Sequence, residues 1–376
     1  MGRVVAQDLV ESEEFEVVVA ADANAQSLRA CRSRVQSPKL DTVRVDASDE
    51  SAVADLMKGF DVSAVCLPNR LSLGAVRAAV RSGTHAVDLV GIEPEKRLAL
   101  DSAAKEAGVL VVPGLGVAPG LSNVLVGRAV SDLDATESAV IKVGGLPLNP
   151  EPPLHYRIVF CFDSLIEACK RKVRILKDGK LTEVEPLSGR ETVEFPEPVG
   201  ECECFFTDGL STLLHTFKDS GMDFLAEKTV RYPGWCEKMG FLRDIGLFGD
   251  EPVQVGDCRV RPAEFLSRLL DPQLRLREGE KDVTVMRVEV TGLRNEEKVK
   301  ITYDMVDHYD EEHAVTSMAR TTAYPCTSAL RMIARGDLDI RGVIPPESLF
   351  TKALFGKLLA DLRERGVVVH ERETKL

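Results

Sequence analysis

Three residues of the run EKTVRYPG could bind a small charged molecule and move a proton: Lys228, Arg231 and Tyr232. An arginine can clamp a carboxylate with two parallel N–H donors, and a lysine can act as a base. On a strand, Lys228 and Tyr232 would share one face while Arg231 points to the other, so one pocket needs a bend at the following Pro-Gly. We predict that Arg231 and Tyr232 bind substrate and that Lys228 is a catalytic base.

The segment FFTDGLSTLLHT offers a second set of reactive groups. His215 could shuttle protons near neutral pH, although its mostly apolar surroundings also suit a buried structural histidine. Asp208 could take part in catalysis or simply cap the helix that follows it. We predict catalytic roles for His215 and Asp208 and a substrate-binding role for Thr207. The pair Tyr156-Arg157 is a weaker candidate because its setting also suits the surface of a strand.

The start of the chain has the spacing of a dinucleotide site. Asp22 follows Gly2 by about 20 residues, the separation expected between the last glycine of a phosphate-binding loop and the carboxylate that holds a ribose. An acid at that place repels a 2′-phosphate, and no basic residue stands beside it in AADANAQ, so we predict NAD rather than NADP as the cofactor. The alternatives are an ordinary flexible glycine and an acid that caps a helix.

Further ligand contacts are expected where parallel strands end, because open α/β sheets bind ligands outside those ends. Asp46 could reach the adenine. Pro68 and Asn69 lie where the nicotinamide half of the cofactor should bind, and Asn69 could form a hydrogen bond with it. The glycine-rich loop PGLGVAPGLSN could present backbone amides to the nicotinamide or to a substrate carboxylate. Each has a plain alternative as a helix cap, a turn or a linker. The predicted cofactor residues are Asp46, Pro68, Asn69, Asp88 and Gly116, with Glu93 as a substrate contact.

The elements that would position these residues alternate strand and helix over residues 1–125. The runs EVVVAAD, DVSAVCLP and HAVDL are separated by expected helices at 24–35, 71–82 and 94–107, with Asp49 or Ser51 as a further cap. This pattern predicts a Rossmann-type, doubly wound parallel sheet. The strand and the first glycines that open such a sheet are missing, and we expect a misassigned start rather than a true truncation.

Residues 126–321 change pattern and predict an antiparallel α+β substrate domain. The hairpin VRILKDGKLTEVEP turns at Asp178-Gly179, and a second hairpin runs through VTVMRVEVTGLRNEEKVKITYDMV. Helices are expected at about 237–246 and 262–270. The segment 322–376 turns helical, ends in a strand at GVVVHE, and should return to the nucleotide domain.

Composition narrows the class of protein. The chain has 376 residues and a formal net charge of −12, which argues against nucleic acid as a partner. Nine cysteines without a CxxC pair predict no metal site and a reducing cytoplasm. We see no signal peptide and no apolar run of about 20 residues, so no membrane contact is expected. The net charge is compatible with a small cationic substrate but does not choose one, and we expect a second copy of the chain as partner in a homodimer.

Several segments occur in the same order in one enzyme family. VRVDASD, DVSAVCLPN, HAVDL and VVPGLGVAPGLSN would fit many dinucleotide enzymes, whereas GGLPLNPEPPL, FFTDGLSTLLHT and EKTVRYPGW are more specific. Over nearly its whole length the sequence resembles the saccharopine dehydrogenase family, especially its compact lysine 6-dehydrogenase branch. Family members begin with a strand and a complete glycine loop, and this sequence departs from them there.

The resemblance implies that a hydride leaves an amine-bearing carbon for NAD and that the resulting imine is hydrolysed. We expect oxidative deamination of L-lysine at its ε-amino group. A saccharopine dehydrogenase or a carboxynorspermidine-type amine dehydrogenase is the enzymatic alternative, and the basic residues of KRKVR at 170–174 could bind the extra carboxylates of saccharopine. Because the glycine loop is incomplete, a non-catalytic nucleotide-binding regulatory protein is the second alternative.

Overall fold

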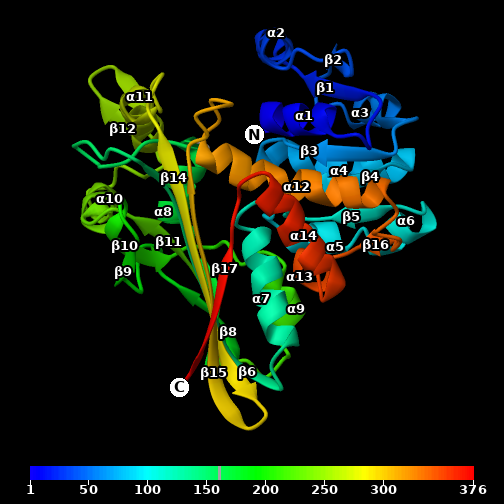
Figure 1. The fold of residues 1–376 in the computed structure, drawn as a ribbon. Coiled ribbons are helices and arrows are strands. Elements are labelled where there is room, and N and C mark those ends of the chain that lie inside the picture. Colours follow the sequence, from blue (N-terminus) through cyan, green and yellow to red (C-terminus); the bar gives the residue numbers. More distant parts are fainter. Residues whose placement is uncertain (160–161) are drawn as a thin grey trace. The chain divides into compact units, whose positions relative to one another are not determined.

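The computed structural model describes residues 1–159 and 162–376, and the chain forms two compact units (Figure 1). The two are called unit 1 and unit 2 below. Unit 1 consists of Met1–Leu133, Ser211–Phe217 and Arg320–Val368, and unit 2 of Asp134–Leu210, Lys218–Ala319 and Val369–Leu376.

Unit 1 alternates helices and strands from its first residues. The expected helix at 94–107 is two helices, because Leu100 leaves the helical conformation (φ −85°, ψ 0°) and the chain restarts at Asp101, whose carboxylate accepts the N–H of Val343. Asp49 caps its helix as predicted, accepting the backbone N–H groups of Ser51 and Ala52 at 3.0 Å. The helices of this part are α1 (Gly2–Glu11), α2 (Ala25–Arg34), α3 (Glu50–Met57), α4 (Asn69–Ser82), α5 (Pro94–Leu98), α6 (Asp101–Glu106) and α7 (Leu121–Ser131).

The parallel sheet of unit 1 has two pieces. Its strands are β1 (Val18–Asp22), β2 (Leu40–Arg44), β3 (Val62–Val65), β4 (His85–Asp88), β5 (Leu110–Val112) and β16 (Gly342–Val343). One piece is β2-β1 and the other is β3-β4-β5-β16. In a doubly wound sheet the opening strand pairs with the strands that correspond to β1 and β3. Within the described residues neither strand has a partner on that edge.

A buried cluster holds the larger piece of this sheet against its helices. Val76 and Ala79 of α4 are fully buried against strand residues that include Ala86 and Val111. Apolar runs that are buried on both faces are typical of parallel sheets. The predicted Rossmann-type fold class is therefore confirmed for unit 1.

The C-terminal helices also belong to unit 1. Arg331 is buried and forms ion pairs with Asp8 at 2.7 Å and Asp361 at 3.2 Å, while Arg365 reaches Asp8 at 2.6 Å. This network joins three helices that are distant in sequence. They are α1, α12 (Ser317–Ala334) and α14 (Ala353–Glu364); α9 (Leu213–Phe217) and the short α13 (Pro346–Leu349) complete the unit.

The last strand contradicts the sequence expectation. Residues 366–369 form no strand, and β17 (His370–Lys375) pairs antiparallel with β15 (Glu297–His308) in unit 2. Val367 is buried in unit 1, whereas the following polar residues supply the backbone hydrogen bonds to the edge of β15. Strand pairing has overridden the β propensity of the valines here.

Unit 2 is built on one sheet of nine strands. Its order is β17-β15-β14-β6-β11-β10-β9, with β7 and β8 joined to the sheet through β11. The sheet is mainly antiparallel, as expected, except that β6 and β11 are parallel. The long segment between them makes the crossover that parallel pairing requires. The remaining strands are β6 (Ala135–Pro147), β7 (Val173–Lys177), β8 (Lys180–Val184), β9 (Glu191–Phe195), β10 (Gly200–Phe206), β11 (Phe224–Arg231) and β14 (Asp282–Arg294).

Two tight turns set the register of the hairpins. Asp178 and Gly179 both have positive φ (52° and 69°), as the predicted turn requires. In the β14–β15 hairpin Asn295 and Glu296 do the same (50° and 66°). Beside these hairpins lie the small ribbon of β12 (Val253–Val255) and β13 (Cys258–Val260) and the helices α8 (Phe162–Lys170), α10 (Trp235–Asp244) and α11 (Pro262–Leu274), two of which match the predicted helices.

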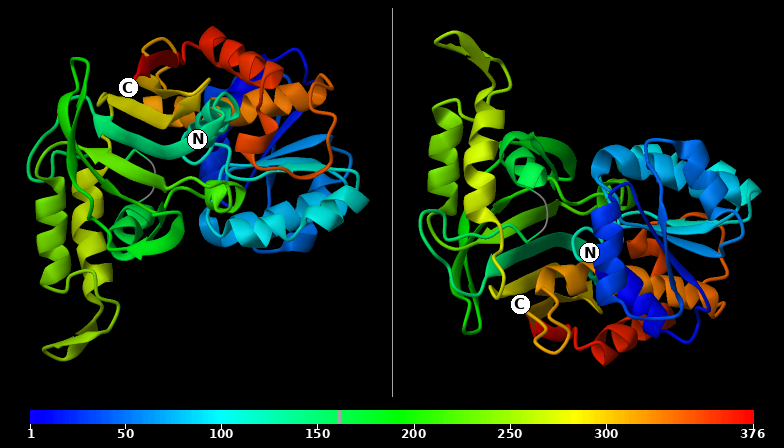
Figure 2. Two further views of the ribbon diagram at one scale, coloured as in Figure 1. Left: turned by 90° about the horizontal axis from the view of Figure 1, so that it is seen from below. Right: turned by 90° about the horizontal axis from the view of Figure 1, so that it is seen from above.

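The two faces of the unit 2 sheet differ. Helices α8, α10 and α11 lie along one face in both views of Figure 2, and Phe205 of β10 is buried in a cluster with Trp235 and Leu266. We call this the helix face. The opposite face holds a second cluster that includes Cys204 and Val230. Because strand residues alternate, Glu227, Thr229 and Arg231 of β11 lie on the helix face, and Lys228, Val230 and Tyr232 lie on the other.

Candidate functional site

In unit 1 the predicted cofactor residues follow the carboxyl ends of the parallel strands. The loop after β4 and the loop after β5 are tightly packed: a side chain at Gly91 would collide with Pro119 and lie 2.6 Å from Oγ of Ser211. That Oγ donates to the carbonyl of Gly91 at 2.8 Å. The segment 211–217 thus reaches unit 1 and fixes the loops at the edge where ligands of such sheets bind.

Gly116 lies in the loop between β5 and α7. Its N–H donates to the carbonyl of Pro119 at 2.9 Å, and a side chain at Gly120 (φ 133°) would collide with the Gly116 carbonyl. Asn123 of α7 accepts the N–H of Gly120 at 3.3 Å. The loop is a rigid backbone turn that opens a helix, a geometry that can present amides to an anion.

Asp88, at the end of β4, is fully buried, and both of its carboxylate oxygens accept hydrogen bonds. It accepts Ser72 Oγ at 2.8 Å, the N–H of Val90 at 2.9 Å and Nε of Arg97 at 2.7 Å. Burial raises the pKa of Asp88, and the Arg97 guanidinium opposes that rise. These contacts leave Asp88 as a support for the loop at 89–93 rather than a direct cofactor ligand.

The start of α1 lies next to the end of β3. A Cβ atom at Gly2 would be 3.6 Å from that of Cys66, one residue beyond the strand. The same loop carries Pro68 at the N-cap position of α4 and Asn69 as its first residue. The structure therefore brings Gly2, Pro68 and Asn69 to the same edge of unit 1.

The expected ribose and adenine residues are exposed. Asp22 ends β1 and accepts the N–H of Asn24 at 2.7 Å, while Asp46, beyond β2, accepts the N–H and hydroxyl of Ser48. Those hydrogen bonds lower the pKa of Asp46. Arg44 pairs in register with Asp22 and donates Nε to the carbonyl of Ala23 at 3.1 Å. A basic group thus lies beside Asp22, and it escaped the sequence argument because it stands on the neighbouring strand.

His215 is not the buried core residue that one alternative foresaw. It lies on α9, its side chain is 32% exposed, and Nε2 is 3.0 Å from Oε1 of Glu95. Glu93, just before α5, has φ 52° and pairs with Lys96 instead of capping the helix with its side chain. In unit 1, His215 and Glu93 therefore lie on surface elements, each with a charged or polar partner.

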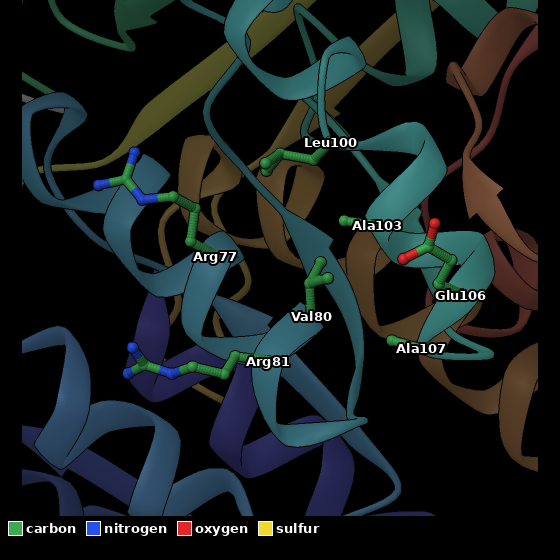
Figure 3. Close-up of a pocket in the computed structure, with 7 residues that line it drawn as sticks. All are labelled: Arg77, Val80, Arg81, Leu100, Ala103, Glu106 and Ala107. Atoms are coloured by element: carbon green, nitrogen blue, oxygen red, sulfur yellow. The ribbon is translucent and has the colours of Figure 1, made fainter.

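The hollow drawn in Figure 3 is not at this edge. Its lining includes Arg77 and Arg81, near the end of α4, and Glu106 at the end of α6. These helix ends lead into the starts of β4 and β5, so the hollow lies toward the opposite ends of the strands. Both arginines already bind Glu50, one through its carboxylate and one through its carbonyl. The hollow therefore offers neither the position nor the free groups of a reaction site.

In unit 2, Arg231 has the surroundings of an anion-binding group. Its side chain is on the helix face and is 5% exposed. The guanidinium carbon lies 4.5 Å from the ring centre of Tyr156 and 5.5 Å from that of Trp235, and Nη1 donates to the carbonyl of Val230 at 2.7 Å. No carboxylate of a described residue lies within ion-pair distance of it; Glu203, opposite in register on β10, accepts the N–H of Cys236 at 2.7 Å instead. A buried guanidinium without a counter-ion is costly, and such groups often mark binding sites.

Three hydrogen-bond donors at this place, one of them on Arg231 itself, have no hydrogen-bond partner in the described part of the chain. Nε of Arg231, the hydroxyl of Tyr156 and Nε1 of Trp235 are buried and have no hydrogen bond to a described residue. Burial raises the pKa of the Tyr156 hydroxyl, so it remains a donor at neutral pH. Arg157, the neighbouring candidate, instead forms ion pairs with Glu151 and Glu280. The donors point to a site for an anion such as a carboxylate.

Glu227 is a buried acid that the sequence argument missed. It lies on the helix face of β11, four positions before Arg231, and Oε2 has no hydrogen-bond partner among the described residues. Burial, helped by the nearby Asp208 carboxylate, raises the pKa of Glu227 to about 8. The signal was present in the sequence, because the alternation used for Lys228 and Arg231 places Glu227 beside Arg231 on the same face.

Asp208 neither caps α9 nor stands free as a base. The helix begins only at Leu213, and the Asp208 carboxylate binds Nε of Arg171 at 3.1 Å and Nε of Arg174 at 3.4 Å. Thr207 bonds through its hydroxyl to that of Thr229 at 2.9 Å. The expected cap is therefore wrong: the two arginines hold the carboxylate within unit 2.

Lys228 and Tyr232 lie on the face opposite Arg231, as strand alternation predicted. Lys228 Nζ donates to the carbonyl of Gly189 at 2.8 Å, pairs with Glu191 at 3.2 Å and lies over the ring of Phe206. The Tyr232 hydroxyl donates to the carbonyl of Pro147 at 3.1 Å. No bend brings them to Arg231, so these two residues and Arg231 do not form one pocket.

Comparison with known protein families agrees with the fold of both units. Residues 116–367 match the saccharopine dehydrogenase C-terminal domain, and residues 1–112 match the saccharopine dehydrogenase NADP binding domain. The chain belongs to the saccharopine dehydrogenase family. A pyridine nucleotide-binding domain is therefore present in this family member, and the resemblance inferred from the sequence is confirmed.

Relatives of this saccharopine dehydrogenase family member include enzymes of different size. A saccharopine dehydrogenase [NADP(+), L-glutamate-forming] of Schizosaccharomyces pombe is 20% identical over 89% of either chain. A carboxyaminopropylagmatine dehydrogenase of Synechocystis is 22% identical over 99% of this chain and 95% of its own. The mouse alpha-aminoadipic semialdehyde synthase is 23% identical over 97% of this chain, which spans only 46% of that protein.

A solved structure supports the same fold. The apo saccharopine dehydrogenase (L-Glu forming) of Saccharomyces cerevisiae has a TM-score of 0.82 and 18% identity, covering 99% of this chain and 97% of the yeast chain. In the parts of the chain that the structure describes, no helix is long and apolar enough to span a membrane. The same residues contain no group of three or more His, Cys, Asp or Glu side chains placed to hold a metal.

Proposed function

We propose that the protein is an amine dehydrogenase that oxidises L-lysine at its ε-amino group with NAD as hydride acceptor. The observation that carries this proposal is the buried Arg231 with its unused donors, which suits the carboxylate of an amino acid. The nicotinamide ring, when bound, takes the hydride from the carbon that bears the amine. The residues of this chain bind the substrate, orient it and move its protons.

The nucleotide would bind at the carboxyl edge of the unit 1 sheet. Pro68, Asn69 and the Gly116 loop follow the ends of strands, where such ligands bind, and Gly2 lies beside Cys66 at the end of β3. Asp22 at the end of β1 supports NAD, since its carboxylate suits the ribose hydroxyls and repels a 2′-phosphate. Exchanging the acid tests this choice: Asp22→Ser should lower the affinity for NAD and raise that for NADP, measured by calorimetry with each nucleotide.

Use of NADP is the alternative for the cofactor, and two observations favour it. The matched domain is named for NADP, and Arg44 lies in register beside Asp22. An arginine there could bind a 2′-phosphate. Removing it with Arg44→Met should leave NAD binding intact under the first proposal and weaken NADP binding under the alternative.

A saccharopine-cleaving activity is the second candidate, because the names of the relatives from S. pombe and S. cerevisiae favour it. Saccharopine carries more carboxylates than lysine and needs more cationic partners. The basic cluster at 170–174 was the expected source, but its members pair with acids of unit 2: Lys170 with Asp250, and Arg171 and Arg174 with Asp208. Arg231, which forms no ion pair with a described residue, fits one carboxylate and therefore favours lysine.

The test is turnover by the chain together with any in-frame sequence that precedes it. Formation of reduced nucleotide would be followed with L-lysine, saccharopine and a carboxylated polyamine, each with NAD and NADP. Ammonia release from L-lysine supports the first proposal, and glutamate release from saccharopine supports the second. If no substrate reduces either nucleotide and calorimetry detects no nucleotide binding, the enzyme proposal fails. Nucleotide binding without turnover would favour the regulatory protein. The homodimer and the cytoplasmic location stay predictions.

A further inference from the structure

The helix face of β11 carries unused polar groups of opposite kinds at its two ends. At one end, Nε of Arg231, the hydroxyl of Tyr156 and Nε1 of Trp235 are buried donors without a partner among the described residues. At the other end, Oε2 of Glu227 is a buried acceptor that also has no hydrogen-bond partner among the described residues. Donors suit a carboxylate, and a carboxylate acceptor suits an ammonium group.

A purely structural role accounts poorly for this arrangement. The rings of Tyr156 and Trp235 stabilise the guanidinium, but burying a charge without a counter-ion costs more than such ring contacts contribute. Glu227 lacks even that help, since the charge that acts on it is the like charge of the Asp208 carboxylate. Two such groups on one strand face indicate a ligand that carries both charges.

The separation of the two ends suits a particular ligand length. Four residues of strand place the Cα atoms of Glu227 and Arg231 about 13 Å apart. In extended L-lysine the ε-nitrogen and the carboxylate carbon are roughly 7 Å apart, judged from six bonds of about 1.5 Å. A hydrogen bond of about 2.8 Å at each end would place the two binding side-chain groups about 13 Å apart, and side chains that project side by side from one strand face keep roughly the spacing of their Cα atoms. An α-amino group lies much too close to its carboxylate to bridge the two residues.

We propose that Arg231 holds the substrate carboxylate while Glu227 holds the reacting amine and takes its proton, so that β11 sets the distance between them. This assignment rests on the proposed amine oxidation and adds to it the base and the substrate length. Substrates of this site carry an amine and a carboxylate that are separated by the chain length of lysine.

The proton and electrons balance as follows. The Glu227 carboxylate takes a proton from the substrate ammonium, which leaves a neutral amine with a free electron pair. That pair forms the second carbon–nitrogen bond as the hydride leaves the adjacent carbon for the oxidised nicotinamide nucleotide. Water then adds to the iminium carbon, and ammonia leaves as a carbonyl forms.

The surroundings of Glu227 suit a group that changes charge in this way. A pKa raised to about 8 keeps the free acid protonated at neutral pH, and an entering ammonium stabilises the ionised form. The carboxylate packs directly against Gly209, filling the space that a Cβ atom at that position would need. The N–H of Thr207 also donates to the Glu227 carbonyl at 3.1 Å.

The first experiment measures turnover with variants and substrate analogues. Glu227→Gln should lower kcat for L-lysine about 100-fold or more and remove the limb of the pH profile that reports the base. Arg231→Met should raise KM for L-lysine but not for 1,5-diaminopentane, which is lysine without its carboxylate. L-Ornithine, one methylene shorter, should lose 10- to 100-fold in kcat/KM, as about 1 Å of misplacement can cause.

Matched controls separate these effects from a general loss of fold. Glu194→Gln and Arg259→Met change exposed residues of unit 2 and should leave every constant unchanged. Retention of kcat and of the pH profile in Glu227→Gln would overturn the assignment of the base. Equal kcat/KM for ornithine and lysine would overturn the distance argument.

A second experiment does not depend on turnover. Calorimetry of L-lysine binding at pH 7, in buffers of different ionisation enthalpy, should show release of up to about one proton from Glu227 and none in Glu227→Gln. If this release is seen but no nucleotide is reduced, the amine site stands and the dehydrogenase proposal fails. If turnover occurs without the release, the proposed function stands and the Glu227 assignment fails. If neither is seen, both fail.

Discussion

The sheets of the two units are built in opposite ways. In unit 2 the central strands β6, β14 and β11 each pair on both sides, so most backbone groups are satisfied within one sheet. In unit 1, β1 and β3 each have an edge without a partner among the described residues. An unpaired edge must bind water or another strand. We infer that the substrate groups of unit 2 are fixed by the sheet itself, whereas the cofactor edge of unit 1 depends on contacts made by its helices and loops.

Among the substitutions that test this difference between the units, Arg331→Met is expected to have the largest effect on stability. Arg331→Met leaves the buried acids Asp8 and Asp361 with weaker partners, and removing one member of a buried ion pair costs about 3 kcal/mol or more. Hydrogen exchange should show faster opening of α12 and α14 in unit 1, while amides of β14 and β15 keep their protection. Arg32→Met is the control, since its pair with Asp41 is exposed and contributes under about 1 kcal/mol. Equal loss of protection in the two units would contradict the contrast.

The next effect concerns unit 2 and depends on pH. The pKa of Glu227 is raised from 4.5 to about 8 in the folded chain, so its contribution to stability is complete below pH 4.5 and is lost as pH rises toward 8. Glu227→Gln removes that dependence. Relative to the parent, the variant should gain up to a few kcal/mol between pH 5 and pH 8 in urea unfolding.

The exposed Glu194→Gln serves as the control for that measurement, because its side chain is in water in either state. A difference between Glu227→Gln and the parent that stays constant from pH 5 to pH 8 would show that Glu227 ionises normally. Unit 2 would then lack the buried, uncompensated acid on which the amine site depends.

The same contrast explains what the sequence could predict. Local patterns predicted β1, β3 and β4 of unit 1, though not β16, together with the cap at Asp49 and the turn at Asp178-Gly179, because each depends on a few neighbouring residues. Pairings between distant segments were not predictable: β6 lies parallel to β11, β17 joins β15, and the segment 211–217 enters unit 1. Such pairings depend on tertiary hydrogen bonds that propensity does not report.

The candidate site shows the same limit. Arg231 was found from its residue type, and strand alternation correctly placed Lys228 on the other face. The missing partner of Arg231 and the raised pKa of Glu227 are properties of burial, and no residue type reveals burial by itself. Asp208 was misjudged for the converse reason, because its arginine partners are more than 30 positions away in sequence.

A smaller effect is expected at the cap of α3 in unit 1. Asp49→Ala removes an acceptor for two backbone N–H groups and should lower the free energy of unfolding by about 1 kcal/mol. Asp49→Ser should restore most of the loss. Asp55→Ala, in the same helix but exposed and paired only with Lys58, should have little effect. Thermal unfolding would compare these three variants. If Asp55→Ala lowered the free energy of unfolding as much as Asp49→Ala does, loss of the helix cap would not be the cause.

The smallest effect is expected to be a stabilisation of unit 2. Glu296 is exposed in the β14–β15 turn with φ 66°, a conformation that favours glycine. Glu296→Gly should therefore raise the free energy of unfolding by up to about 1 kcal/mol and slow exchange at the ends of β14 and β15. The reverse change in the other hairpin, Gly179→Ala at φ 69°, should destabilise β7 and β8 by a similar amount. If Glu296→Gly loosens its hairpin instead, side-chain contacts rather than backbone conformation determine the stability of that turn.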